Sequence, residues 1–354
     1  MPLLMSRSAA PRPRRRSALA RFATAALVAL GMIAATSSPA SALTPTPVFP
    51  GALGTVPFNV SGTYTPLPLL CGPDLDIFWY APGTAADFIW SGIDVSGPAL
   101  TYSTRPTTVN GTYTPLVGDY DGDSCDDIFW YAPGGGADYI WYNNGGSTFT
   151  SKQVAVNGSY RPIVNFFNED STSDIYWYAP GTTAEAMWVG NTNRTVTSVR
   201  APQVNGTYQP MPFLDNGVLW YGPGSAPDAI TAFTAGSATP QMSVSTIIGG
   251  NFRAVPFWAF PLLYAPGATQ DFLIVDADVV GSFAELLVIP GSINGTYRTG
   301  TTPSGPIAVL HAPGSAVDQL MYDLPDAAAA ADGPTDWTHL HQDRQSALEV
   351  LAAG

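Results

Sequence analysis

The feature that most constrains the fold of this chain is a short phrase, Tyr-Ala-Pro-Gly, that returns at nearly regular intervals. Exact copies occupy residues 80–83, 131–134, 178–181 and 264–267, and degenerate copies occupy 221–224 and 311–314. The last glycines of successive copies are 51, 47, 43, 43 and 47 residues apart. Six copies at this period indicate a repeat protein in which each copy belongs to one supersecondary unit.

Two further elements recur with the same period. A turn of the type Asn-Gly-Thr-Tyr precedes each aromatic run, at residues 61–64, 110–113, 157–160, 205–208, 249–252 and 294–297. Asn-Gly is a strong signal for a turn between two strands. An acidic residue followed by an aromatic run comes after the Pro-Gly turn, as in 87–90, 138–141 and 185–188. Each unit therefore has room for four strands, named a to d here.

The second unit illustrates the expected blade. We expect strand a at 113–118, strand b at 127–132, strand c at 138–142 and strand d at 149–156. Four antiparallel strands in about 47 residues form one blade of a β-propeller. The b strands are apolar on both faces, which suits a sheet packed between two neighbouring blades better than a two-layer sandwich. The predicted fold is an all-β propeller of about six four-stranded blades, with seven possible if the C-terminal tail adds one.

The ends of the repeat region predict how the ring closes. The sixth unit ends after strand c, near residue 322, while residues 55–60 form a lone strand before the first unit. We expect this N-terminal strand to become strand d of the last blade, which removes two exposed sheet edges. The propeller domain then covers 43–323, and a tail of 324–354 follows that is partly helical, at 327–331 and 336–352.

The first 42 residues have the pattern of a secretory signal peptide. Six arginines precede an apolar run at 22–35, and Ala-Ser-Ala at 40–42 resembles a cleavage site. A retained membrane anchor is the alternative, but the apolar run is shorter than the roughly 20 residues that a spanning helix needs. We expect a secreted protein, extracellular or in the cell envelope, without membrane insertion after cleavage and monomeric.

Charge narrows the range of partners. The chain has 14 basic and 27 acidic residues, and removal of the first 42 residues takes away six of the basic ones, which leaves a net charge of −19. A surface this acidic repels phosphate backbones and anionic headgroups, so we expect no nucleic-acid partner. Cations and neutral polar ligands remain.

The sequence predicts one metal site with particular clarity. Residues 119–127, Asp-Tyr-Asp-Gly-Asp-Ser-Cys-Asp-Asp, place carboxylates at alternate positions of a short loop. Calcium prefers six to eight oxygen ligands in such loops. We expect the side chains of Asp119, Asp121, Asp123 and Asp127 and the backbone carbonyl of Cys125 to bind calcium. The alternative is a solvated, acid-rich turn that binds no metal.

The corresponding loop of the third unit is a weaker metal candidate. It keeps Asn168, Asp170 and Asp174 but has Phe166 in the first ligand position. A polar turn without metal is the favoured interpretation.

The chain resembles a known family at these loops. Residues 118–123 followed by 126–134 are similar to FG-GAP or VCBS-type repeats, found in the head of integrin α-subunits and in secreted bacterial relatives. The resemblance covers about 55–322 and implies a β-propeller with calcium in its a–b loops, with ligation carried over to Asp119, Asp121, Asp123 and Asp127 only. Two features depart from the family: integrin heads have seven blades, and most blades here lack the metal loop.

The two cysteines, Cys71 and Cys125, lie in the a–b loops of neighbouring units. In an exported protein we expect them to form a disulfide, with two free thiols as the alternative. The three histidines, His311, His339 and His341, form no metal-binding pattern, and we expect His311 to be a packed core residue because it replaces the tyrosine of strand b.

No catalytic motif is apparent, so we expect a non-enzymatic binding or adhesion module that holds a glycan or an extracellular protein on one face of the propeller. Asp87, Asp138 and Glu185 are candidate ligand contacts on the face that carries the b–c loops and d–a turns. Two alternatives stay open. One is a polysaccharide-acting enzyme with an acid pair in the central channel, and the other is a purely structural envelope protein.

Overall fold

The computed structural model describes residues 53–323, apart from short gaps at 96–98, 182, 215, 235–239, 258–259, 266–269, 281, 292, 294, 306 and 315. The described residues belong to one compact unit and form 24 strands. Among them, no helix is long and apolar enough to cross a membrane. The predicted signal peptide, residues 43–52 and the predicted helical tail lie outside the described residues.

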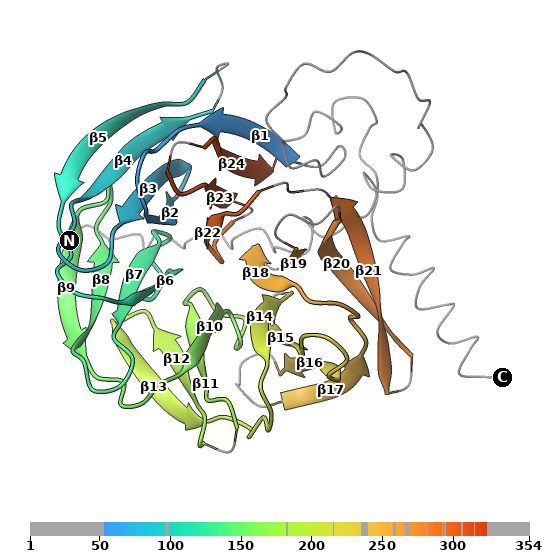
Figure 1. The fold of residues 1–354 in the computed structure, drawn as a ribbon. Coiled ribbons are helices and arrows are strands. Elements are labelled where there is room, and N and C mark those ends of the chain that lie inside the picture. The colour runs from blue at the N-terminus through green and yellow to red at the C-terminus, as the bar shows by residue number, and fades with distance from the viewer. Residues whose placement is uncertain are drawn as a thin grey trace, which may run out of the picture. The chain divides into compact units, whose positions relative to one another are not determined.

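The strands form six antiparallel blades arranged in a ring, and a parallel pairing of their outer strands joins blades 4 and 5 into one eight-stranded sheet (Figure 1). Blade 1 contains β2 (Thr65–Cys71), β3 (Asp74–Tyr80), β4 (Asp87–Asp94) and β5 (Thr101–Thr107). Blade 2 contains β6 (Thr114–Gly118), β7 (Asp127–Tyr131), β8 (Asp138–Asn143) and β9 (Phe149–Val154). Blade 3 contains β10 (Arg161–Asn165), β11 (Asp174–Tyr178), β12 (Ala186–Asn191) and β13 (Thr195–Arg200).

The remaining three blades follow the same order. Blade 4 contains β14 (Gln209–Phe213), β15 (Gly217–Tyr221), β16 (Asp228–Phe233) and β17 (Pro240–Thr246). Blade 5 contains β18 (Arg253–Phe257), β19 (Phe260–Tyr264), β20 (Asp271–Val280) and β21 (Phe283–Gly291). Blade 6 contains β22 (Arg298–Thr301), β23 (Ile307–His311), β24 (Asp318–Asp323) and β1 (Leu53–Phe58). The prediction of a six-bladed propeller with four strands per blade is confirmed.

The ring closes through the N-terminal strand, as the sequence predicted. β1 pairs antiparallel with β24 along its whole length, from Leu53 opposite Asp323 to Phe58 opposite Asp318. The Phe58 ring also packs edge-on against Trp79 of blade 1, with 5.8 Å between the ring centres. The first strand of the described chain therefore completes the last blade and contacts the first one.

The hydrophobic core lies between blades rather than within one layer. All five residues of β7, β11, β15, β19 and β23 are buried. One core cluster, for example, joins Phe78 of blade 1 to Trp130 of blade 2, whose rings are 5.4 Å apart. Apolar residues on both faces of each b strand are thus explained by a neighbouring blade on each side.

The repeated tyrosine of strand b ties each blade to the next. Tyr131 donates its hydroxyl hydrogen to the carbonyl of Gly158 at 2.8 Å and accepts the N–H of Tyr160 at 2.9 Å, both in the turn that enters blade 3. His311 replaces this tyrosine in blade 6, is fully buried, and accepts the N–H of Tyr64 through Nε2. The expectation that His311 is a core residue is confirmed, and the imidazole takes over the acceptor role of the phenol.

Candidate functional site

The acidic loop between β6 and β7 brings three carboxylates together. Asp119, Asp121 and Asp127 are all buried, and each offers an oxygen that lies within 4.8 Å of the other two. Asp119 and Asp127 lie at the two ends of the loop, directly after β6 and at the start of β7, so strand pairing holds them close to each other. This trio can hold a metal ion.

Backbone hydrogen bonds fix the shape of the loop around Asp119. Its two carboxylate oxygens accept the N–H groups of Gly122 at 2.6 Å and Ser124 at 3.0 Å. Gly122 and Ser124 both have positive φ angles, 76° and 78°, so the loop coils tightly and turns its N–H groups inward. Each carboxylate oxygen has a second lone pair, which leaves Asp119 able to bind a cation as well.

The carboxylate of Asp127 is held by the chain segments on either side of β7. Its carboxylate accepts the N–H of Tyr120 at 2.9 Å and the N–H of Asn143 at 2.8 Å. Asp76 and Asp174, the equivalent residues of blades 1 and 3, accept N–H groups from strand c in the same way, at 2.8 and 2.9 Å. An aspartate at the start of strand b therefore has a structural role in three blades. Only in blade 2 do two further acids, Asp119 and Asp121, lie close to it.

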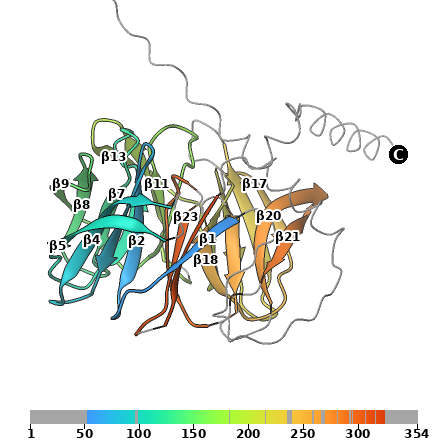
Figure 2. The ribbon, with the colours of Figure 1, turned by 90° about the horizontal axis from the view of Figure 1, so that it is seen from above.

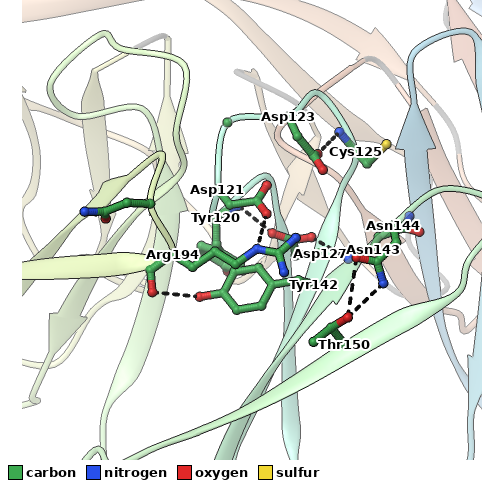
Figure 3. A network of polar contacts seen from close by, with 12 residues as sticks. Tyr120, Asp121, Asp123, Cys125, Asp127, Tyr142, Asn143, Asn144, Thr150 and Arg194 are labelled. Carbon is green, nitrogen blue, oxygen red and sulfur yellow. Dashed lines mark hydrogen bonds and ion pairs between the residues drawn. The ribbon is translucent and has the colours of Figure 1, made fainter.

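One carboxylate oxygen of Asp121 has a partner and the other has none (Figure 3). Its Oδ2 pairs with the Nε of Arg194, from the turn between β12 and β13 of blade 3, at 2.7 Å. Its Oδ1 is buried and has no hydrogen-bond partner among the described residues. The Arg194 guanidinium also stacks on the ring of Tyr142, 4.5 Å from its centre. One positive side chain thus faces three carboxylates, and one buried carboxylate oxygen still lacks a partner.

Burial dominates the electrostatics of the site. Removal from water, together with the charges of Asp121 and Asp119, raises the pKa of Asp127 to about 9, against the opposing effect of the hydrogen bonds from Asn143 and Tyr120. Burial raises the pKa of Asp119 to about 6, against the opposing effect of its hydrogen bonds from Ser124 and Gly122. Without a bound cation, Asp127 keeps a proton at neutral pH that an ordinary carboxylate has lost, whereas Asp119, with its smaller pKa shift, has lost most of its own.

The structure places Asp123, another of the predicted ligands, outside the trio. Asp123 is exposed, and its Oδ1 accepts the N–H of Cys125 at 2.9 Å. Its pKa is raised by partial burial and by the neighbouring charge of Asp121. Asp123 is thus close to Asp121 but outside the buried trio.

Cys71 and Cys125 form a disulfide, as predicted, which links the loops of blades 1 and 2 across 54 residues of sequence. The same two residues form an isolated antiparallel bridge, with the N–H of Gly72 donating to the carbonyl of Ser124 at 3.1 Å. The acidic loop is therefore anchored covalently to blade 1 at the residue next to Asp126.

Asp126 is a residue whose role the sequence reasoning missed. Its fully buried carboxylate accepts the N–H of Leu70 in blade 1 at 2.7 Å and the hydroxyl of Thr302 in blade 6 at 2.7 Å, and it also accepts the hydroxyl of Ser304. One side chain of blade 2 therefore joins two other blades. Its partners lie 56, 176 and 178 residues away in sequence, so local spacing gave no signal for this role.

The third-blade loop has a different arrangement. Phe166 is buried in the first ligand position, and the amide nitrogen of Asn168 donates to Asp170 at 2.7 Å. The other oxygen of Asp170 accepts the backbone N–H and the hydroxyl of Thr172. Asp174 accepts the N–H groups of Asn168 and Gly190. These contacts describe a polar turn and bring no third acid to the site.

The three acids expected on a ligand-binding surface lie inside the protein. Asp87, Asp138 and Glu185 are 1%, 0% and 5% exposed. The carboxylate of Asp87 accepts the N–H of Ala81 at 2.7 Å with one oxygen and that of Val109 at 2.6 Å with the other.

The equivalent acids of the other blades make matching contacts. Asp138, Asp228, Asp271 and Asp318 each accept one N–H from the b–c loop and one from the following d–a turn, and Glu185 accepts the N–H of Val204. These acids fasten the b–c loop to the next d–a turn, which corrects their expected place on a binding surface.

The inner strands line a central channel of about 210 Å³. Prolines and threonines dominate the wall, with Pro66, Pro115, Pro162 and Pro210 at equivalent positions. Among the described residues, the channel wall contains no acid and no histidine. An acid pair inside the channel, on which the enzyme alternative depended, is therefore missing from the described part of the chain.

No protein-family model matches the chain, and no curated protein matches it.

Proposed function

We propose that this protein is an exported, non-enzymatic binding module that holds a polar ligand, a glycan in first place, on the face formed by the b–c loops and d–a turns. The disulfide is consistent with an extracellular location. The propeller provides a rigid ring with two separate rims of loops (Figure 2). The rims differ strongly in chemistry, and this difference indicates which one is suited to a glycan.

The observation that carries the proposal is the lack of charged residues in the loops and turns of one rim, named the uncharged rim here. The six b–c loops and six d–a turns contain no Asp, Glu, Lys, Arg or His, in a chain with 27 acidic residues. These segments are 59–64, 81–86, 108–113, 132–137, 155–160, 179–184, 201–208, 222–227, 247–252, 265–270, 292–297 and 312–317. The a–b loops of the opposite rim carry the acidic loop with Asp119 to Asp126. Twelve separate segments without charge leave this rim with amide, hydroxyl and aromatic groups, the groups that recognise sugars.

The uncharged rim also has a concave place for a ligand. A groove of about 510 Å³ lies over blades 3, 4 and 5 and is lined by Arg161, Thr207, Tyr208 and three prolines, among other residues. Tyr208 is half-buried, and Thr207 beside it is exposed. A partly exposed ring next to hydroxyl groups offers both the apolar face and the hydrogen bonds that a pyranose ring needs.

Calcium in the acidic loop is the second part of the proposal. Three observations support it: the convergent carboxylates of Asp119, Asp121 and Asp127, the unpartnered buried oxygen of Asp121, and the coiled backbone between them. A bound calcium ion would satisfy that oxygen and remove the repulsion within the trio. Asp123 and the carbonyl of Cys125 are the next oxygens along the loop. The role of the ion is structural, because the loop lies on the rim opposite the proposed binding face.

A matched pair of variants tests the binding face. Thr207→Glu puts a charge into the groove, whereas Thr104→Glu puts the same charge on exposed β5, the outer strand of blade 1. The wild-type protein and both variants are applied to a glycan array and to isolated cell-wall polysaccharide. We expect the wild type and Thr104→Glu to bind and Thr207→Glu to lose binding. Equal binding by both variants, or no binding by the wild type to any glycan, would overturn the proposal.

A further inference from the structure

Three arginines stand at equivalent places around the mouth of the channel on the uncharged rim. Arg161, Arg253 and Arg298 are the first residues of β10, β18 and β22, the inner strands of blades 3, 5 and 6 (Figure 1). Each follows directly after an uncharged d–a turn. They make up three of the seven basic residues between 53 and 323. Three of the few basic residues in this part of the chain thus lie next to turns that contain no acidic residue.

Two of these arginines are close neighbours. The Nη1 of Arg253 donates to the carbonyl of Tyr297 at 3.0 Å, and Tyr297 immediately precedes Arg298. In the described part of the chain, neither arginine forms an ion pair with an acid. The guanidinium of Arg253 therefore lies beside the backbone of Arg298, and an anion bound between the two side chains would meet two positive charges.

The nearby acids of the same rim do not serve as these anions. Asp271 accepts the N–H groups of Ala265 and Ile293, and Asp318 accepts those of Ala312 and Val60 together with a contact to His311. Both are fully buried. Their oxygens already accept hydrogen bonds within the fold, and neither acid forms an ion pair with these arginines in the described part of the chain.

Arg161 extends the site toward the groove. Its Nη1 donates to the carbonyl of Tyr208 in blade 4, and the side chain lines the 510 Å³ groove together with Tyr208 and Pro210. A guanidinium group has five N–H donors in a planar fork that matches a carboxylate. Aromatic and proline rings beside it provide a flat apolar wall for a sugar ring.

We propose that the channel mouth binds a polysaccharide whose sugars carry carboxylates, with Arg253 and Arg298 holding one acid group and Arg161 another. The inference rests on the proposed glycan-binding face and names its ligand class. Carboxylates that repeat along a polymer match arginines that repeat along the ring. Because the opposite rim is acidic, the rim at the arginines is the surface where such a ligand meets the least repulsion.

Calorimetric titration of the full chain without residues 1–42 tests this proposal. The probes are the galacturonate hexamer and its fully methyl-esterified form, which has the same sugar rings without charge, at about 50 mM NaCl. Hyaluronate and its carboxyl-reduced form supply a second sugar backbone. The variant is Arg253→Gln combined with Arg298→Gln, and the control is Arg200→Gln, an exposed arginine at the end of outer strand β13.

We expect the acidic probes to bind about tenfold more tightly than their uncharged forms. The double variant should lose this preference, and Arg200→Gln should keep it, with unchanged melting temperatures as the check on folding. Equal affinity for the acidic and uncharged probes in wild type and double variant would overturn the arginine site and leave the glycan face intact. Failure of the protein to bind any glycan would overturn both proposals. Binding of a polyglutamate peptide with no binding of the acidic sugars would overturn the choice of polysaccharide in favour of an acidic protein.

Discussion

Asp121 of blade 2 and Arg194 of blade 3 form an ion pair of 2.7 Å although they are 73 residues apart in sequence. The pair joins the acidic loop to the β12–β13 turn of the next blade and supplies one positive charge to a group of three buried carboxylates. Arg194 is thus a built-in partial substitute for a cation. Any metal that binds the trio must share Asp121 with this arginine or displace it.

Calcium binding can therefore be tested through both members of the pair. If the ion is structural, about 100 Kd of calcium should stabilise the folded protein by about 2.7 kcal/mol relative to the protein in chelator. Asp121→Asn should abolish this difference because it removes a ligand charge, whereas Arg194→Gln should increase the affinity because it removes the competing cation. The measurement is the melting temperature of each protein with calcium and with EDTA.

The comparison within each protein matters because neutralising one acid can stabilise the metal-free form by itself. Asp170→Asn in the equivalent loop of blade 3 is the matched control and should keep the wild-type response. A wild-type melting curve that is the same in calcium and in EDTA would contradict the structural ion.

Asp126 should be among the most sensitive positions of the chain. Asp126→Ala leaves the N–H of Leu70 and the hydroxyls of Thr302 and Ser304 without their acceptor. Losses of buried hydrogen bonds to a charged group cost about 1.5–3 kcal/mol each in favourable cases and are not additive, so we expect a destabilisation of about 3–5 kcal/mol. Urea unfolding measures it. Asp123→Ala, an exposed acid of the same loop, should cost less than about 1 kcal/mol in metal-free buffer, and equal costs for the two variants would contradict the role given to Asp126.

The raised pKa of Asp174 predicts that the stability of the protein depends on pH with a sign opposite to that caused by an ordinary ion-paired acid. Burial raises the pKa of Asp174 to about 7 in the folded protein, and the nearby charge of Asp170 adds to the shift. The folded state then keeps a proton that the unfolded state loses near pH 4, so stability falls as the pH rises from about 4 to 7. Asp174→Asn should make this fall smaller by a few kcal/mol over the window, measured as the unfolding free energy in urea. If the unfolding free energies of the two proteins changed with pH in parallel, this would contradict the raised pKa of Asp174.

The repeat pattern predicted the strands of this fold well because each unit encodes them locally. In blade 2 the predicted strands agree with β6 to β9 within two residues. The N-terminal closing strand was predictable because one strand was missing at one end of the repeat and one was spare at the other.

The candidate site was less predictable because its partners come from different blades. The spacing of the acids identified Asp119, Asp121 and Asp127, but nothing near them in sequence pointed to Arg194. Asp87, Asp138 and Glu185 were expected on a binding face because they directly follow the b–c loops of that face. Their strict position at the start of strand c in every unit was the available signal for a structural role.

Closure of the ring has a consequence that deletion can test. Removal of residues 43–58 exposes β24 of blade 6 as an unpaired edge and uncovers Trp79, against which Phe58 packs. We expect the truncated protein to dimerise or aggregate and to melt at a lower temperature, because free sheet edges pair with one another. Size-exclusion chromatography with light scattering distinguishes these states. A monomeric truncated protein with the wild-type melting temperature would show that β1 contributes nothing to closure.

Two tyrosine variants show directly whether the uncharged rim binds the ligand. Tyr208 borders the groove on that rim, while Tyr102 is an exposed tyrosine on outer strand β5. The measurement is the dissociation constant of the wild type, Tyr208→Ala and Tyr102→Ala for isolated cell-wall polysaccharide, with melting temperatures to confirm folding. We expect Tyr208→Ala to weaken binding about tenfold or more and Tyr102→Ala to leave it unchanged. Binding that is lost in Tyr102→Ala and kept in Tyr208→Ala would contradict it.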